Sequence, residues 1–172
     1  MDLINRMEKR KNDPVNPVYP VNLLMDEKET ICKTLDDTFE LGERLGKSLQ
    51  AGDVVLLYGG LGAGKTLLTK GILRALDFDV DEVTSPSFTL VNLYKTRCFD
   101  VYHIDLWRLD GTSDAATAVG LDEILENENA VTIIEWADRL GDIWFPNKII
   151  RVRIDGDGDE PRMIEIKNLE IS

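Results

Sequence analysis

Residues 56–70 read LLYGGLGAGKTLLTK, and more follows from this segment than from any other part of the chain. Four glycines stand between two apolar segments that differ in period. The first segment, DVVLLY at 53–58, is a short continuous apolar run, typical of a strand buried on both faces of a sheet. In the second, apolar residues such as Leu68 and Ile72 form one stripe, which predicts a helix over 65–76. The predicted order is strand, glycine-rich loop, helix.

The pattern Gly59-x-x-x-x-Gly64-Lys65-Thr66 matches a phosphate-binding loop, in the setting that such loops require. Glycines allow positive φ and close backbone approach, so successive N–H groups can point at phosphate oxygens. The dipole of the following helix acts at the same place. Lys65 is expected to reach the outer phosphates, and the Thr66 hydroxyl to bind Mg²⁺.

Two acidic residues at predicted strand ends are candidates for the metal shell, because Mg²⁺ in such sites is held by carboxylates directly or through water. Glu135 closes the apolar run VTIIE, and Asp105 closes VYHID. Either or both can serve the metal, and strand-terminal acids are also common as helix caps. His103, the only histidine, lies inside a strand two residues before Asp105. We interpret it as structural.

The segment TSPSFT at 84–89 is a polar loop that leads into a strand. Its hydroxyl residues, Ser85 and Ser87 among them, can face the γ-phosphate in the manner of a switch loop. The alternative is an ordinary turn built on Pro86. Trp136 directly follows Glu135, and it can belong either to a partner surface or to the core.

The remaining hydrophobic pattern predicts further elements. A helix is expected over 34–50, where apolar residues recur near helical spacing and Thr34-x-x-Asp37 resembles a capping box. Gly42 and Gly46 on the same face let this helix pack closely on a neighbour. Two antiparallel strands are predicted at 88–95 and 99–105, and a short helix at 121–126. A buried strand follows at 130–136, and a hairpin is predicted from the segments 148–154 and 162–166.

The fold class follows from this order of elements. The sequence predicts an α/β fold: a P-loop NTPase-like three-layer domain with a mixed, mainly parallel sheet and an antiparallel edge. Residues 1–28 contain three prolines and little hydrophobic periodicity, so we interpret them as an N-terminal arm, flexible or laid across the surface. Residues 29–172 are the predicted P-loop domain.

The composition limits the classes of function. The chain has 172 residues, 43% hydrophobic and 30% charged, which suits one soluble domain. No apolar run approaches the roughly 18 residues that span a membrane, and the two cysteines have neither metal-ligand spacing nor the density of a disulfide scaffold. We expect a cytoplasmic protein that does not bind membranes. Its net charge of −12 disfavours direct binding to DNA or tRNA, because clustered Lys and Arg supply that binding.

Four segments together resemble the TsaE family, the small ATPases of bacterial threonylcarbamoyl-adenosine tRNA modification. They are GGLGAGKT, SPSFTLVNLY, YHIDLWRL and IIEWADRL, and the resemblance covers about residues 34–166. It implies a protein that binds ATP and Mg²⁺, with an ATPase that is weak alone and stimulated by two partners, TsaD and TsaB. Transfer of the threonylcarbamoyl group would belong to TsaD. The tRNA would be contacted only indirectly, which fits the acidic charge.

The resemblance also implies roles for individual residues. The phosphates would be cradled by Gly60, Leu61, Gly62, Ala63, Gly64, Lys65 and Thr66. The magnesium would be served by Thr66 and Glu135. The catalytic residues would be Lys65, Asp105 and Glu135, with Asp105 supporting metal or water. Nucleotide contacts are expected near Thr38 and Arg162. The switch-like segment or partner surface would include Ser85, Ser87 and Trp136.

The sequence departs from the family pattern at three positions. Gly60 replaces the usual aspartate, Ser87 replaces a common threonine but keeps the hydroxyl, and Ala137 stands where proline is frequent. The main alternative function is a small-molecule kinase of the P-loop class. Such kinases usually carry arginines on a lid, whereas no lid-like insertion is evident here. A regulatory GTPase is weaker still, because NKII at 147–150 lacks the aspartate that would read guanine.

Overall fold

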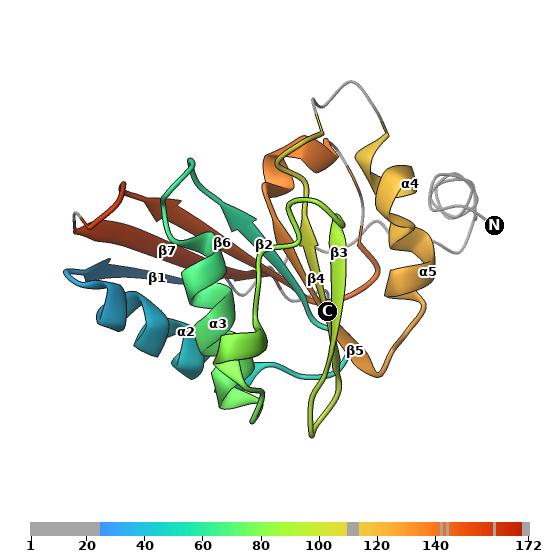
Figure 1. The fold of residues 1–172 in the computed structure, drawn as a ribbon, viewed down its shortest axis with the longest axis horizontal. Helices are drawn as coiled ribbons and strands as arrows, with labels where there is room; N and C mark the ends of the chain where they lie inside the picture. The colour runs from blue at the N-terminus through green and yellow to red at the C-terminus, as the bar shows by residue number, and fades with distance from the viewer. Residues whose placement is uncertain (1–24, 110–113, 142, 144, 160, 170–172) are drawn as a thin grey trace.

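The structure, a computed structural model, describes residues 25–109, 114–141, 143, 145–159 and 161–169 (Figure 1). Within these residues seven strands form one sheet in the order β1-β7-β6-β2-β5-β4-β3. The strands are β1 (Met25–Cys32), β2 (Val54–Tyr58), β3 (Val91–Lys95), β4 (Asp100–Asp105), β5 (Ala130–Glu135), β6 (Ile149–Asp155) and β7 (Arg162–Leu169). The four central strands, β6, β2, β5 and β4, are parallel, whereas β3, β7 and β1 pair antiparallel at the two edges. The predicted mixed sheet is confirmed.

Helices cover both faces of this sheet. Helices α2 (Leu35–Ser48) and α3 (Lys65–Ala75) pack on one face (Figure 1). Helices α4 (Ala115–Val119) and α5 (Leu121–Leu125) pack on the other face (Figure 1). Val55 and Leu57 of β2 lie in the core under α2 and α3, whereas Val54 and Leu56 lie in the core on the α5 side. Alternate residues of one strand point to opposite faces, so a continuous apolar run is needed when both faces are covered. The three-layer architecture is confirmed.

Helix α2 begins at the predicted capping box and packs tightly on α3. Thr34 Oγ1 accepts the backbone N–H of Asp37, and Asp37 Oδ2 accepts the backbone N–H of Thr34. A Cβ atom added to Gly42 would lie 2.3 Å from the Leu68 carbonyl oxygen, and one added to Gly71 would lie 2.1 Å from the Phe39 carbonyl oxygen. The glycines therefore permit the close approach of the two helices, as the sequence predicted for Gly42.

The predicted boundary between arm and domain needs a correction. Residues 25–28, which the sequence analysis placed in the arm, are part of β1, and the rest of the predicted arm, residues 1–24, lies outside the described residues. Strand β1 was missed because its sequence, MDEKETIC, is mostly polar. As an edge strand it pairs with β7 alone, and edge strands carry charged residues readily.

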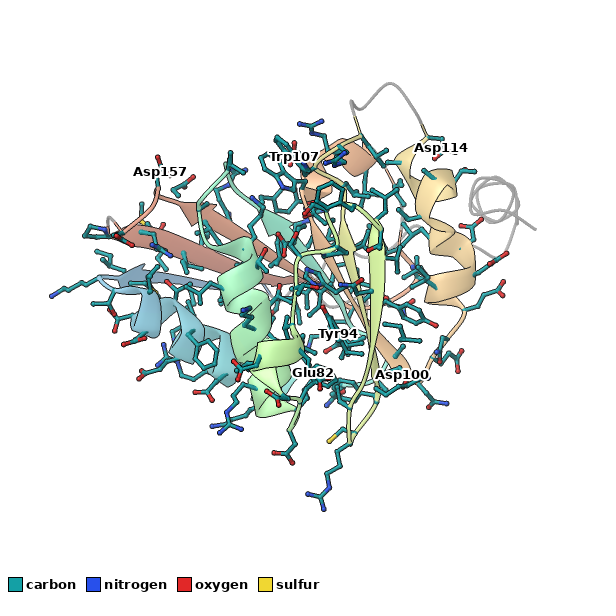
Figure 2. All side chains as sticks on the ribbon, viewed as in Figure 1. Glu82, Tyr94, Asp100, Trp107, Asp114 and Asp157 are labelled. Atoms are coloured by element: carbon teal, nitrogen blue, oxygen red, sulfur yellow. The ribbon has the colours of Figure 1, made fainter. Side chains whose placement is uncertain are left out.

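Two 3₁₀ turns complete the described elements, η1 (Val80–Glu82) and η2 (Ala137–Leu140). Among the described residues no helix has the length and apolar character needed to cross a membrane. Trp107, just beyond the carboxyl end of β4, lies at the upper side of the molecule in Figure 2, and Asp100, at the start of β4, lies at the lower side. Open α/β sheets bind ligands at the carboxyl ends of their parallel strands. The upper side is therefore where a site is expected.

Candidate functional site

The glycine-rich loop connects β2 to α3. Some of its positions have a backbone conformation that only glycine adopts easily, whereas others could hold a different residue. Gly59 has φ of +151°, and a Cβ there would lie 2.6 Å from the Ile154 carbonyl oxygen of β6. Gly64 has φ of +108°, and a Cβ there would lie 2.7 Å from Nη1 of Arg162. Both positions require glycine. Gly60 is different, because a Cβ there would meet nothing within 4 Å.

The N-terminus of α3 has no side-chain cap and no acidic residue in its first turn. The first N–H groups of a helix have no partner within the helix, and the helix dipole makes this end electropositive. Helix α2, by contrast, satisfies its own N-terminus with Thr34 and Asp37. The end of α3 thus keeps the donors and the positive potential that an anion needs.

Lys65, the first residue of α3, is almost fully buried, with 5% of its surface exposed. Its Nζ donates hydrogen bonds to the carbonyl oxygens of Gly59 at 2.8 Å and Gly60 at 2.7 Å. The same atom lies 3.9 Å from the centre of the Trp136 ring. Burial lowers the pKa of Lys65, although the nearby Glu135 acts in the opposite direction. The loop therefore holds a partly desolvated cation.

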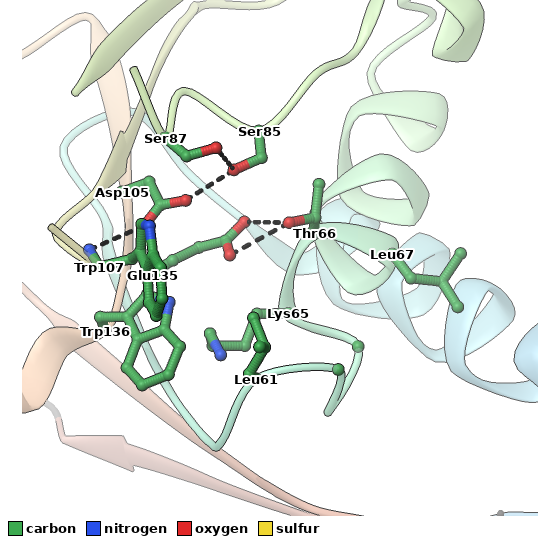
Figure 3. Close-up of a pocket in the computed structure, with 12 residues that line it drawn as sticks. Leu61, Lys65, Thr66, Leu67, Ser85, Ser87, Asp105, Trp107, Glu135 and Trp136 are labelled. Carbon is green, nitrogen blue, oxygen red and sulfur yellow. Dashed lines mark hydrogen bonds between the residues drawn. The ribbon is translucent and has the colours of Figure 1, made fainter. Parts of the chain in front are cut away.

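The two predicted acids lie side by side at the carboxyl ends of adjacent strands. Asp105 of β4 and Glu135 of β5 are register partners, and both are buried. Thr66 Oγ1 donates to Glu135, at 2.9 Å from Oε1 and 3.1 Å from Oε2. Figure 3 shows the Thr66 hydroxyl and the Glu135 carboxylate pointing toward one another. Residues 69 positions apart in the chain are thus brought into contact.

Asp105 is fixed from both sides. Its Oδ2 accepts a hydrogen bond of 2.6 Å from Ser85 Oγ, and its Oδ1 accepts one of 2.9 Å from the Trp107 backbone N–H. Ser85 Oγ also lies 3.2 Å from Ser87 Oγ. The loop at 84–89 is thereby connected to the acid of β4, and a switch role for this loop stays a prediction.

These groups surround one pocket of about 360 Å³. The residues that line it are Leu61, Gly62, Gly64, Lys65, Thr66, Leu67, Ser85, Ser87, Asp105, Trp107, Glu135 and Trp136 (Figure 3). Most of the residues predicted for the site are in this set. Gly60 and Ala63 are not: the Gly60 carbonyl accepts the N–H of Ala63, whose side chain is buried in the core below the loop.

The structure does not bring Thr38 and Arg162 into this pocket. Both are buried behind the loop, where Thr38 Cγ2 and Arg162 Nη1 would lie 3.7 Å and 2.7 Å from a Cβ atom on Gly64. Arg162 Nη2 donates to the carbonyl oxygen of Gly158. A nucleotide contact for these two residues stays a prediction.

Trp136 is half-buried and has a left-handed backbone, with φ of +57°. This conformation is a strained one for a bulky residue. Its ring packs on Lys65 and lies 5.8 Å from that of Trp107, which is 40% exposed. Trp136 therefore forms a wall of the pocket, between the core and the surface.

Sequence reasoning missed three residues of the site: His103, Trp107 and Leu67, the last of which lines the pocket next to Thr66. His103, interpreted as structural, lies with Nε2 2.8 Å from Oε1 of Glu135. Trp107 lines the pocket and was not singled out at all. A signal for His103 was available, because residues i and i+2 of a strand share a face and His103 precedes Asp105 by two.

The side chains present fit a magnesium ion bound together with phosphate. Thr66 donates its hydrogen to Glu135, which leaves the lone pairs of the hydroxyl oxygen for a cation. No group of three or more His, Cys, Asp or Glu side chains within the described ranges could hold a metal alone. Mg²⁺ suits such a site, because it is commonly held by one or two protein groups, phosphate oxygens and water.

Comparison with known proteins gives a consistent result. A model of one protein family, described as threonylcarbamoyl adenosine biosynthesis protein TsaE, matches residues 32–164. The chain is similar to curated proteins named tRNA threonylcarbamoyladenosine biosynthesis protein TsaE. That of Mycobacterium leprae is 42% identical over 118 residues, covering 65% of this chain and 73% of the relative. That of Rickettsia bellii is 31% identical over 144 residues, covering 84% and 97%.

A solved structure is also similar. The crystal structure of YdiB from Bacillus subtilis aligns with a TM-score of 0.67 and 26% sequence identity, and the alignment covers 86% of this chain and 88% of that one. Residues 32–164, which the family model matches, include every residue that lines the pocket.

Proposed function

The chain belongs to the TsaE family of threonylcarbamoyl adenosine biosynthesis proteins, and we propose from its site that it is a Mg²⁺-dependent ATP-binding protein with a weak, partner-stimulated ATPase. In this proposal it supports the threonylcarbamoyl modification of tRNA adenosine together with TsaD and TsaB, and does not transfer the group itself. The observation that carries the proposal is the convergence, in one pocket, of an uncapped helix N-terminus, a buried lysine and the Thr66–Glu135 pair.

The lysine and the helix end support the binding of phosphate. The Lys65 ammonium has exchanged water for two loop carbonyls and an aromatic ring. An anion at the end of α3 would meet this cation and the free N–H groups of the first helical turn together. A neutral ligand would gain less from either, so these two groups favour an anionic ligand such as a phosphorylated one.

The pair formed by Thr66 and Glu135 supports the binding of Mg²⁺. Thr66 would ligate the ion through its hydroxyl oxygen, and Glu135 would act on it directly or through water. A bound ion would supply charge stabilisation to the phosphates. Glu135 keeps the hydroxyl of Thr66 oriented whether or not it touches the ion itself.

Asp105 is the second carboxylate of the pocket, and we propose that it binds a water molecule. Ser85 and the Trp107 N–H each take one of its oxygens, which fixes the plane of the carboxylate. Each oxygen keeps a further lone pair, so Asp105 can accept a hydrogen bond from a water molecule in the pocket. Orientation of an attacking water is a recurring need in phosphoryl transfer. We assign this role to Asp105.

Exposed apolar residues near the pocket support a partner surface. Leu61 is 74% exposed, and Phe88, in the loop at 84–89, is 82% exposed with Arg108 4.2 Å from its ring centre. Together with Trp107 they place apolar area on the loops that line or adjoin the pocket. Exposed aromatic residues of this kind are typical of protein interfaces. A partner bound here would contact the loops that hold the nucleotide.

The experiment that tests this function measures ATP hydrolysis by the purified chain with Mg²⁺, alone and with TsaD and TsaB. We expect slow hydrolysis alone, a clear increase with both partners, and loss of the increase in Lys65→Ala and Glu135→Ala. Phe88→Ala is expected to weaken the stimulation. Rapid phosphate transfer to a metabolite without partners would instead establish a small-molecule kinase. Equal hydrolysis by wild type and Lys65→Ala would show that the loop is not the active element.

A further inference from the structure

His103 is a buried polar residue for which the proposed function has no task so far. None of its surface is exposed, and it lies on β4 on the same face as Asp105. Its Nε2 lies 2.8 Å from Oε1 of Glu135, the oxygen that also accepts the hydrogen bond from Thr66. Nδ1 is buried and has no hydrogen-bond partner among the described residues. Within the described part of the chain, the imidazole thus has one polar contact, which is with Glu135.

The two ring nitrogens determine how the proton must be placed. A carboxylate oxygen accepts hydrogen bonds, so Nε2 must carry the hydrogen that joins the two residues. The hydrogen on Nε2 therefore points at the carboxylate, and His103 donates a hydrogen bond to Glu135.

Packing holds the ring in this orientation. Tyr94 of β3 lies with its ring centre 6.1 Å from that of His103 and with its hydroxyl donating to the Thr84 carbonyl oxygen at 2.9 Å. Phe78 in turn packs edge-on against Tyr94, at 5.0 Å. The imidazole is therefore confined between an aromatic side chain and the Glu135 carboxylate.

We propose that His103 is a positioning residue: its Nε2–H fixes the Glu135 carboxylate in the rotamer that orients the Thr66 hydroxyl and serves Mg²⁺. This inference rests on the proposed function and adds to it a residue that acts through Glu135 without touching the nucleotide. Partners that orient a metal-binding group from behind matter, since their loss typically lowers metal affinity or activity by about 10- to 100-fold. The expected effect is on Mg²⁺, with little effect on nucleotide binding in its absence.

The first test measures the Mg²⁺ concentration that gives half of the metal-dependent increase in binding of a fluorescent ADP analogue. His103→Phe removes the donor and keeps a ring, and it should raise this concentration by about 10- to 100-fold. His103→Gln, whose amide can still donate, should recover most of the loss. Val101→Ala, a core truncation on the same strand and face, should lower stability without moving the Mg²⁺ midpoint.

The outcomes separate the two proposals. Unchanged midpoints in both His103 variants, or equal shifts in His103→Phe and Val101→Ala, would overturn the positioning role. Failure of the wild-type protein to bind the nucleotide in the presence of Mg²⁺ would instead overturn the proposed function itself.

A second test needs no variant, because His103 is the only histidine in the chain. In untagged protein labelled with ¹⁵N, the two imidazole nitrogens can be assigned directly, and their couplings to the ring protons distinguish the tautomers. We expect a hydrogen on Nε2, directed at Glu135. The opposite tautomer would turn an unprotonated Nε2 toward the carboxylate and would overturn the inference, even if His103→Phe fails to fold.

Discussion

Thr66 Oγ1 lies 2.9 Å from Oε1 of Glu135, although the two residues are 69 positions apart in the chain. The contact joins the start of α3 to the end of β5, at the side of the sheet where parallel strands present their carboxyl ends. A substitution of Glu135 should therefore weaken the binding of Mg²⁺ more than it weakens the binding of nucleotide.

The first prediction concerns Glu135→Gln, which keeps the size of the side chain and removes its charge. Mg²⁺ affinity should fall by about 10- to 100-fold, because the carboxylate orients Thr66 and attracts the ion. Binding of ADP without Mg²⁺ should change little. Glu123→Gln, exposed on α5 beyond the other face of the sheet, is the matched control. Equal Mg²⁺ dependence in the two variants would contradict the assigned role.

The second prediction concerns the backbone of the loop. Gly59→Ala should lower the free energy of unfolding by about 1–3 kcal/mol, because the residue has positive φ and its Cβ would meet the Ile154 carbonyl oxygen. Gly60→Ala, one residue along, should have almost no effect, since the space around it is open. Urea denaturation of both variants checks this. A larger loss in Gly60→Ala would show that the loop has a different conformation.

The contact between α2 and α3 gives the third prediction. Alanine normally stabilises a helix relative to glycine by up to about 1 kcal/mol. Gly71→Ala should do the opposite and destabilise by about 1–3 kcal/mol, because its Cβ would lie 2.1 Å from the Phe39 carbonyl oxygen. Glu40→Ala, exposed on α2, should stay close to wild type in the same thermal or chemical denaturation. A stabilised Gly71→Ala variant would be incompatible with this packing.

The buried ammonium gives a prediction about pH. Burial lowers the pKa of Lys65 in the free protein from its ordinary value of 10.5, whereas a bound phosphate would raise it. The protonated form of Lys65 binds phosphate better. ATP affinity should therefore be highest below the pKa that Lys65 has in the free protein, and it should fall as the pH rises through that pKa. Titrations of ATP from about pH 7 to about pH 10 measure this fall.

Lys65→Arg is the control for the pH dependence, because a guanidinium stays charged over this range. The ATP affinity of this variant can differ from that of the wild type, but it should not fall with rising pH as the wild-type affinity does. An identical decline in both proteins would assign it to another group.

The sequence predicts the local parts of the site well and the long-range parts less well. The positions of Lys65 and Thr66 follow from a loop pattern with one geometry, and Glu135 follows from its place at the end of a buried strand. The contact of His103 with Glu135 depends instead on which strands are neighbours. The sheet pairs β4 with β5 in one register, and no spacing within either strand encodes that.

The same reason explains the errors at the edges of the fold. Strand β1 has no apolar alternation, because it lies at the edge of the sheet and pairs through its backbone with β7; of its described side chains, only Cys32 is buried in the core. Arg162 lies beneath Gly64 because the β6–β7 hairpin packs against the loop, a tertiary contact that residue type alone does not predict. Local pattern thus specifies the chemistry of the pocket, and strand order specifies what lies around it.

The most direct test of the central claim is calorimetric titration of ATP with Mg²⁺ into the purified protein and into Lys65→Ala. We predict one binding site in the wild type and an affinity about 10- to 100-fold weaker in the variant, the effect of losing a charged hydrogen bond of about 1.5–3 kcal/mol. Lys70→Ala, in the same helix and outside the pocket, should bind like the wild type. Absence of binding in the wild type, or equal affinity in wild type and Lys65→Ala, would contradict the claim that this loop holds ATP.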